Sequence, residues 1–178
     1  PAAESPVMHP VNVSLQETWH AMEQLKASGR VNHIGVCNYN SGLLHDLMNY
    51  ANQPPELLQI ESHPYLTQER LIKLAKQYGI EVTAFSPLGA RSYFELDMAE
   101  QHESVLEHST IKAAASRTHK TPAQVVLRWG LQRGTSLVVK SVNTERMREN
   151  LSLDDFVLTA TEMTAISGLN INRRFNDP

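Results

Sequence analysis

The feature that most constrains this chain is a repeated alternation of short β-forming stretches with amphipathic helical stretches. Periodicity and residue type predict strands over 31–36, 56–61, 80–85 and 136–140. The same pattern predicts helices over 14–28, 42–52, 69–79, 110–119, 121–134, 144–153 and 159–169. The predicted strands end near Cys37, Glu61, Ser86 and Lys140. The first two gaps, about 24 and 25 residues, each match one β/α unit, and the third is about 54 residues. The alternation therefore predicts an α/β protein with a parallel sheet and helices on its face.

Two architectures fit this alternation: a doubly wound open sheet, and part of a (β/α)8 barrel. No glycine-rich turn follows any predicted strand, which argues against a Rossmann dinucleotide site. The chain has 178 residues, so we expect a single domain over 1–178. Within it, the proline-rich segment 1–13 is expected to be a loop, and 89–109 a long loop or insertion.

Local chemistry specifies several helix ends. Ser14 followed by Glu17, and Thr159 followed by Glu162, have the spacing of a capping box. Gly29 is placed to end the first helix. These signals act over three or four residues, so they predict helix ends without reference to the rest of the chain.

Composition excludes several classes of function. The net charge of −3 gives no electrostatic basis for binding nucleic acid or an anionic membrane. The apolar runs are shorter than the roughly 18 residues of a membrane span. The first residues, PAAESPVMHP, contain no apolar stretch of the kind found in signal peptides. The single cysteine, Cys37, excludes an intrachain disulfide and a cysteine-based metal cluster, so we expect a reducing, cytoplasmic setting.

Mostly polar side chains gather at the carboxyl ends of the predicted strands, where parallel α/β proteins bind ligands. They are Cys37 and Asn38, then Gln59 and Glu61, then Phe85, Ser86 and Leu88, and finally Lys140 and Ser141. Four such ends in register predict the rim of a pocket. Plainer interpretations are Asn38 as the cap of a turn, Glu61 as an acceptor for loop N–H groups, and His63 as a buried hydrogen-bonding residue rather than a metal ligand.

The stretch LVVKSVNTERMREN, residues 137–150, has the strongest local chemistry. A helix that begins near Thr144 offers unpaired N–H groups and the positive end of its dipole. Lys140 and Arg146 add two cations, and Ser141 adds a hydroxyl donor. Together they predict an anion site, most plausibly for a phosphate monoester. The alternative is a solvated basic turn, with Arg146 paired to one of the two glutamates of the same helix.

The segments GVCNYN, LLQIESHPYL, VTAFSPLG, TPAQVVLRWGLQRG and VVKSVNTERMREN, with NINRRF near the end, resemble the aldo-keto reductases in order and spacing. The resemblance covers about residues 14–175. It implies the family fold, a (β/α)8 TIM barrel. It also implies NADPH as the cofactor, bound in an extended form across the carboxyl mouth of the barrel without a Rossmann domain.

The resemblance assigns part of the rim to the nicotinamide end of the coenzyme. Asn38 and Gln59 would hydrogen-bond the nicotinamide carboxamide, with Cys37 at a place where the family usually has serine. Phe85 would stack on the nicotinamide ring, where tyrosine is frequent in the family. Phenylalanine keeps the stacking surface and lacks only the hydroxyl.

The remaining rim residues would bind the phosphates and the adenosine. Cations at the 2′-phosphate would favour NADPH over NADH, because only NADPH carries that group. The implied contacts are the pyrophosphate with Ser86 and Leu88, the 2′-phosphate with Lys140, Ser141 and Arg146, and the adenine with Glu149 and Asn150.

The catalytic tyrosine, lysine, aspartate and histidine of the family match no segment of this sequence, and the resemblance places them in the first half of the barrel. The chain is therefore expected to supply roughly strands five to eight and their helices. Its expected partners are a small-molecule carbonyl substrate and either an N-terminal half of the barrel or a second copy. The implied function is NADPH-dependent reduction of aldehydes or ketones, aldoses among them, to alcohols.

Two other classes of function remain open at this point. One is a non-catalytic module that binds NADPH, with a regulatory role or none. The other is an unrelated phosphate-binding barrel, such as an aldolase or isomerase. Lys140 is the only lysine at a predicted strand end, which leaves no separate Schiff-base lysine and argues against this last class.

Overall fold

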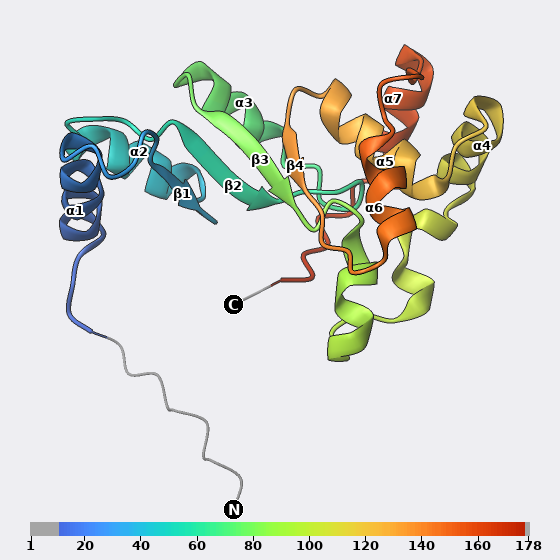
Figure 1. Ribbon diagram of the computed structural model, residues 1–178, viewed down its shortest axis with the longest axis horizontal. Helices are drawn as coiled ribbons and strands as arrows, with labels where there is room; N and C mark the ends of the chain where they lie inside the picture. The colour runs from blue at the N-terminus through green and yellow to red at the C-terminus, as the bar shows by residue number, and fades with distance from the viewer. Residues whose placement is uncertain (1–10, 177–178) are drawn as a thin grey trace, which may run out of the picture.

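The computed structural model describes residues 11–176, apart from the side chains of residues 91–92 and 95–96. Most of the predicted loop 1–13 lies outside these residues, and 11–13 have no regular secondary structure. Figure 1 shows a sheet in the middle of an elongated molecule. Helix α1 (Leu15–Ala27) lies at one end and helix α4 (Ser109–Thr118) at the other.

The sheet has four parallel strands in the order β1-β2-β3-β4, as the alternation predicts. The strands are β1 (Gly35–Cys37), β2 (Leu57–Glu61), β3 (Glu81–Phe85) and β4 (Ser136–Val138). The remaining helices are α2 (Ser41–Tyr50), α3 (Glu69–Gln77), α5 (Pro122–Gln132), α6 (Thr144–Leu151) and α7 (Ala160–Ser167). Segment 89–109 contains the 3-10 helices η1 (Gly89–Leu96), η2 (Gln101–Glu103) and η3 (Val105–Glu107), which the sequence did not predict.

The first strand is shorter than predicted, Gly35–Cys37 in place of 31–36. Gly35 pairs with Leu57. Residues further back would therefore have to pair with the segment that contains Pro54 and Pro55, which have no N–H to donate. Ile34 still accepts a hydrogen bond from the Glu56 N–H at 2.9 Å, but the residues before it lie beside the two prolines and do not continue the ladder.

The fourth strand is also shorter, Ser136–Val138 in place of 136–140. Val138 pairs with Phe85, the last residue of β3. The next residue along β3, Ser86, has a left-handed backbone with φ 47°, and Pro87 follows it. The ladder ends there, so Lys140 lies beyond the sheet, in the turn that leads to α6.

The capping boxes are confirmed. The Ser14 and Thr159 side chains accept hydrogen bonds from the backbone N–H groups of Glu17 and Glu162, at 3.1 and 3.3 Å. Gly29 follows α1 with φ 72°, a left-handed conformation that favours glycine. In the part of the chain that the structure describes, no helix is both long enough and apolar enough to cross a bilayer.

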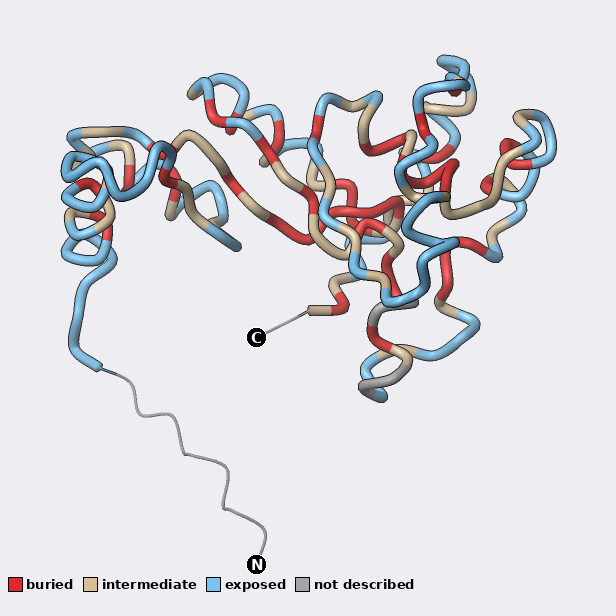
Figure 2. Tube along the Cα trace, in the orientation of Figure 1, coloured by how far each residue is buried: buried red, intermediate tan, exposed pale blue. Residues whose placement is uncertain are grey.

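The core lies on the helix-covered face of the sheet. Alternate residues of β2 and β3 are buried against α2 and α3, and a second core joins α4, α5 and α7 (Figure 2). The strand members of the first core are Leu58, Ile60 and Val82. The residues between them face the other way, so that Cys37, Gln59, Thr83 and Ser136 form one register row across all four strands.

Gly35 allows β1 and β2 to approach each other closely. A Cβ at this position would lie 2.5 Å from the Leu57 carbonyl oxygen, which belongs to the rigid backbone of β2. We expect Gly35→Ala to lower the free energy of unfolding by about 1–3 kcal/mol, as overpacking does. Urea denaturation measures this. Gly168→Ala is the matched control, because Gly168 has φ −67° and a new Cβ there would have ordinary contacts at 3.4 Å. Equal effects of the two substitutions would contradict the prediction.

Candidate functional site

A cleft of about 1420 Å³ opens at the carboxyl ends of β3 and β4. It exceeds the roughly 300–1,000 Å³ of most small-molecule sites. Its walls come from the end of β3 with the 3-10 segment, from the start of α5, and from the β4–α6 turn with α6. Eight of the eleven residues that the resemblance assigns to the coenzyme line it: Phe85, Ser86, Leu88, Lys140, Ser141, Arg146, Glu149 and Asn150.

Lys140 and Arg146 both line this cleft, and neither side chain has an acidic partner among the residues that the structure describes. Glu145 pairs instead with Arg148, at 2.7 Å between Oε1 and Nη1. Glu149 accepts a hydrogen bond from the Thr121 hydroxyl. The pairing of Arg146 with a glutamate of its own helix is therefore wrong, but the turn is solvated as that alternative expected, because Lys140 and Arg146 are both exposed. Two fixed cations face one cleft without a counter-ion from these residues.

The start of α6 is more fully hydrogen-bonded than expected. Asn143 is the N-cap, and its Oδ1 accepts from the Arg146 backbone N–H at 3.0 Å. The Ser141 hydroxyl oxygen accepts from the Asn143 N–H at 3.2 Å. The expectation that this helix start offers unpaired N–H groups is therefore wrong for Arg146. The two cationic side chains are therefore the groups of this turn that remain available to an anion.

Cys37, Asn38 and Gln59 lie at the same edge of the sheet, outside the residues that line the cleft. The Asn38 N–H donates to the Gln59 carbonyl at 2.9 Å, and Asn38 has a left-handed φ of 59°. The left-handed backbone of Asn38 is one that asparagine tolerates in turns, so the plainer interpretation of Asn38 as a turn residue stays open. The helix that follows is capped by Asn40, which accepts from the Leu43 N–H.

Tyr93 is a wall residue that the sequence did not predict. Its hydroxyl lies 2.8 Å from the Ser86 hydroxyl, and its ring stacks on Phe175 with centroids 6.0 Å apart. Burial raises the pKa of Tyr93 above its ordinary value, and the Ser86 hydrogen bond opposes that effect. Tyr93 belongs to η1, inside a segment with no helical or strand periodicity. The one available signal was an aromatic residue shortly after a strand end.

Glu61 holds the C-terminal segment against the end of β2. It is fully buried, and its carboxylate accepts from the N–H groups of Phe175 at 2.8 Å and Asn176 at 3.0 Å. His63 Nε2 lies 3.0 Å from the same carboxylate. Burial alone would raise the pKa of Glu61, but the hydrogen bonds from His63, Phe175 and Asn176 outweigh it and lower the pKa. The predictions for Glu61 as an acceptor of loop N–H groups and for His63 as a buried hydrogen-bonding residue are confirmed.

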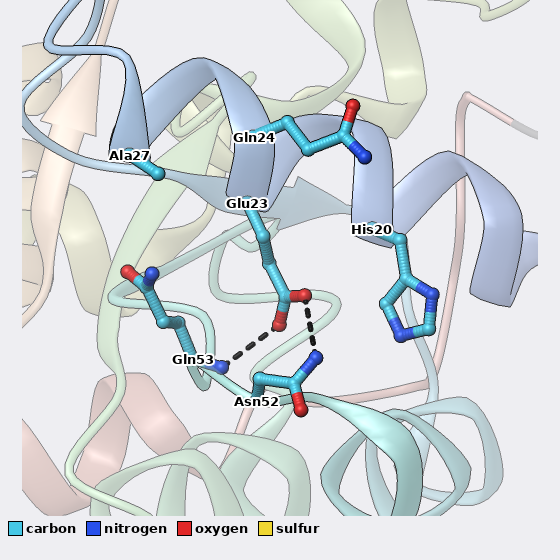
Figure 3. A pocket seen from close by; sticks show the side chains of 6 residues that line it. All are labelled: His20, Glu23, Gln24, Ala27, Asn52 and Gln53. Carbon is cyan, nitrogen blue, oxygen red and sulfur yellow. Dashed lines mark hydrogen bonds between the residues drawn. The ribbon is translucent and has the colours of Figure 1, made fainter.

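A second hollow lies between α1 and the loop after α2, where hydrogen bonds connect these two segments. Figure 3 shows Glu23 pointing at the loop, where it accepts from Asn52 Nδ2 at 3.0 Å and from the Gln53 N–H at 2.8 Å. Trp19 Nε1 donates to the Gln53 carbonyl at 3.1 Å. Both oxygens of the Glu23 carboxylate thus accept hydrogen bonds from the loop after α2. These bonds fix α1 to the segment that precedes β2.

Comparisons with known proteins agree on one family. A family model described as "Aldo/keto reductase family" matches residues 6–171. A probable NAD(P)H-dependent D-xylose reductase of Aspergillus fumigatus is 48% identical over 169 residues, which cover 94% of this chain and 54% of that protein. The NAD(P)H-dependent D-xylose reductase of Kluyveromyces lactis is 46% identical, with 93% of this chain and 51% of that protein covered.

Two solved structures are similar in fold. The apo form of Gox0644 has a TM-score of 0.79 at 37% identity, over 89% of this chain and 55% of that one. The aldose reductase from Schistosoma japonicum has a TM-score of 0.82 at 34% identity, over 92% of this chain and 50% of that one. The chain spans about half the length of the curated relatives it matches.

Proposed function

The chain belongs to the aldo/keto reductase family, and on that premise we propose that it carries the coenzyme-binding part of an NADPH-dependent carbonyl reductase. The family neighbours imply a (β/α)8 barrel. We propose that the four parallel strands correspond to strands five to eight of that barrel. The order of the matched motifs and the half-length coverage support this assignment. The catalytic tyrosine, lysine, aspartate and histidine would then belong to the first half.

The single observation that carries the proposal is the pair of cations at the cleft. Lys140 and Arg146 line it without an acidic partner from the described residues, which fits a group with two negative charges. The 2′-phosphate of NADPH is such a group, and NADH lacks it. Ser141 lines the same wall, and its hydroxyl would contact the phosphate by exchanging its 3.3 Å hydrogen bond to the Asn143 carbonyl for one to a phosphate oxygen.

The other rim residues fit the rest of an extended coenzyme. Phe85 is half-buried at the end of β3 and would face the nicotinamide ring, with Asn38 and Gln59 on the carboxamide and Cys37 beside them. The coenzyme, when bound, supplies the hydride. Across the cleft, the pyrophosphate would meet Ser86 and Leu88, and the adenine would meet Glu149 and Asn150.

The substrate class follows from the relatives' names and not from this cleft. Xylose is an aldose, so we propose aldoses and other small aldehydes or ketones as substrates. We propose the cytoplasm as the setting because a single cysteine fits a reducing compartment. The product of the complete enzyme would be the alcohol.

Fluorescence titration of the purified chain with NADPH and NADH tests the binding proposal. We expect NADPH to bind more tightly. An assay of carbonyl-dependent NADPH oxidation, with and without an added N-terminal half, tests the assignment of the catalytic residues. Turnover by the chain alone would overturn that assignment. Binding without turnover in either mixture would point to a non-catalytic module.

Phe85 offers a sharper test of the nicotinamide end. We expect Phe85→Ala to weaken NADPH binding about three- to tenfold, because the ring loses an aromatic stacking surface. Phe85→Tyr keeps that surface and is expected to retain the affinity, which makes it the matched control. The same fluorescence titration measures both variants. Unchanged affinity in Phe85→Ala would remove Phe85 from the site.

A further inference from the structure

A closed set of hydrogen bonds joins the start of α5 to the end of α6 beside the cleft. Thr121 is the N-cap of α5, and its hydroxyl oxygen accepts from the Gln124 N–H at 3.2 Å. The Gln124 side chain accepts from the Thr121 N–H at 3.1 Å. Its Nε2 donates to the carbonyls of Glu149 and Ser152, at 3.2 and 2.8 Å. Because Gln124 is buried, this set fixes the backbone of Glu149 against α5.

The side chain of Glu149 is fixed by the same helix end. The Thr121 hydroxyl donates to Glu149 Oε1. A threonine hydroxyl has one hydrogen, and its oxygen already accepts from Gln124, so Thr121 acts on Glu149 as a donor. Among the residues that the structure describes, no other group hydrogen-bonds this carboxylate. Oε2 therefore has no hydrogen-bond partner among these residues, and Thr121 and Glu149 both line the cleft.

We propose that Thr121 is a positioning residue that turns the free oxygen of Glu149 toward the purine of the bound coenzyme and thereby selects a base with an exocyclic amino group. The proposal rests on the proposed function. A carboxylate can only accept hydrogen bonds, so it suits the 6-amino group of adenine. The 6-keto oxygen of hypoxanthine is itself an acceptor and would face the carboxylate unfavourably.

The test compares NADPH with its hypoxanthine analogue, by fluorescence titration of the full chain. We expect the unmodified chain to prefer NADPH by at least about tenfold, as expected for a hydrogen bond to a charged group. Thr121→Val should remove most of that preference, and Thr121→Ser, which keeps the hydroxyl, should retain it. Thr159→Val is the matched control, because Thr159 caps α7 through the same kind of capping box away from the cleft.

Glu149→Gln gives an answer even where Thr121→Val fails to fold. The Thr121 hydroxyl would still donate, so it would bind the amide oxygen and turn the NH₂ group toward the base. A donor there favours the keto oxygen, so the preference should invert toward the hypoxanthine analogue. No inversion in Glu149→Gln would overturn the proposal.

The remaining outcomes distinguish the positioning role of Thr121 from the proposed binding of NADPH. Equal weakening of both coenzymes in Thr121→Val would overturn the positioning role and leave Thr121 as a helix cap. NADPH binding with no preference over the hypoxanthine analogue would overturn this inference alone. Failure of the unmodified chain to bind either coenzyme would overturn the proposed function and this inference with it.

Discussion

Replacing both Lys140 and Arg146 by alanine should weaken NADPH binding by about a hundredfold or more and leave NADH binding nearly unchanged. Each cation would make a charge-assisted hydrogen bond to the 2′-phosphate, worth about 1.5–3 kcal/mol, and tenfold in affinity corresponds to about 1.4 kcal/mol. Both side chains line the cleft without an acidic partner from the described residues, so their removal leaves no buried acid unpaired. Fluorescence titration with the two coenzymes measures the effect.

Arg148→Ala is the matched control for this double substitution. Arg148 lies on the same helix, but it pairs with Glu145 and does not line the cleft. We expect it to leave NADPH affinity within about twofold, because an exposed ion pair contributes little. An equal loss of NADPH and NADH binding in the double variant, or a comparable loss in Arg148→Ala, would contradict a phosphate site at this turn.

Glu61→Ala should lower the free energy of unfolding by about 3–5 kcal/mol, because each polar group that is left buried without its partner costs about 1–3 kcal/mol. The substitution removes the acceptor of the Phe175 N–H and of His63 Nε2, which are buried, and of the half-buried Asn176 N–H. Urea denaturation measures the loss. Glu145→Ala removes an exposed carboxylate and should cost less than about 1 kcal/mol. Similar losses in the two variants would contradict the structural role of Glu61.

The same carboxylate predicts a pH dependence of stability. The pKa of Glu61 in the folded chain is lowered from 4.5, its ordinary value. The folded state therefore favours the ionised form, and the resulting stability is complete above that ordinary value. It is lost as the pH falls from there through the lowered pKa of the folded state. Glu61→Gln should flatten this part of the curve of stability against pH, and a curve identical to that of the unmodified chain would contradict the assignment.

Features that depend on near neighbours could be predicted from the sequence. The capping boxes at Ser14 and Thr159 need partners three residues away, and both are present. The parallel sheet follows from the spacing of alternating segments, and it is present as well. The gathering of Lys140 and Arg146 at one cleft was also within reach, because one short turn and the helix after it carry both.

Features that depend on distant partners could not be predicted. The length of β1 was decided by Pro54 and Pro55, which occupy the positions where its partners would have to lie. The second role of Thr121 depends on a carboxylate 28 residues further along the chain. Sequence spacing identifies Thr121 as a helix cap, but it carries no information on which side chain the hydroxyl will meet.

The bond between Glu61 and the Phe175 N–H also bears on the order in which this protein is made and folds. It joins residues 114 positions apart. Synthesis proceeds from the N-terminus, so the strand that carries this acid emerges long before its partners. Loop closure over such a separation is entropically costly, which favours late formation. The Glu61 carboxylate would thus have only the neighbouring His63 as a partner until the segment with Phe175 and Asn176 has been made and has packed against β2.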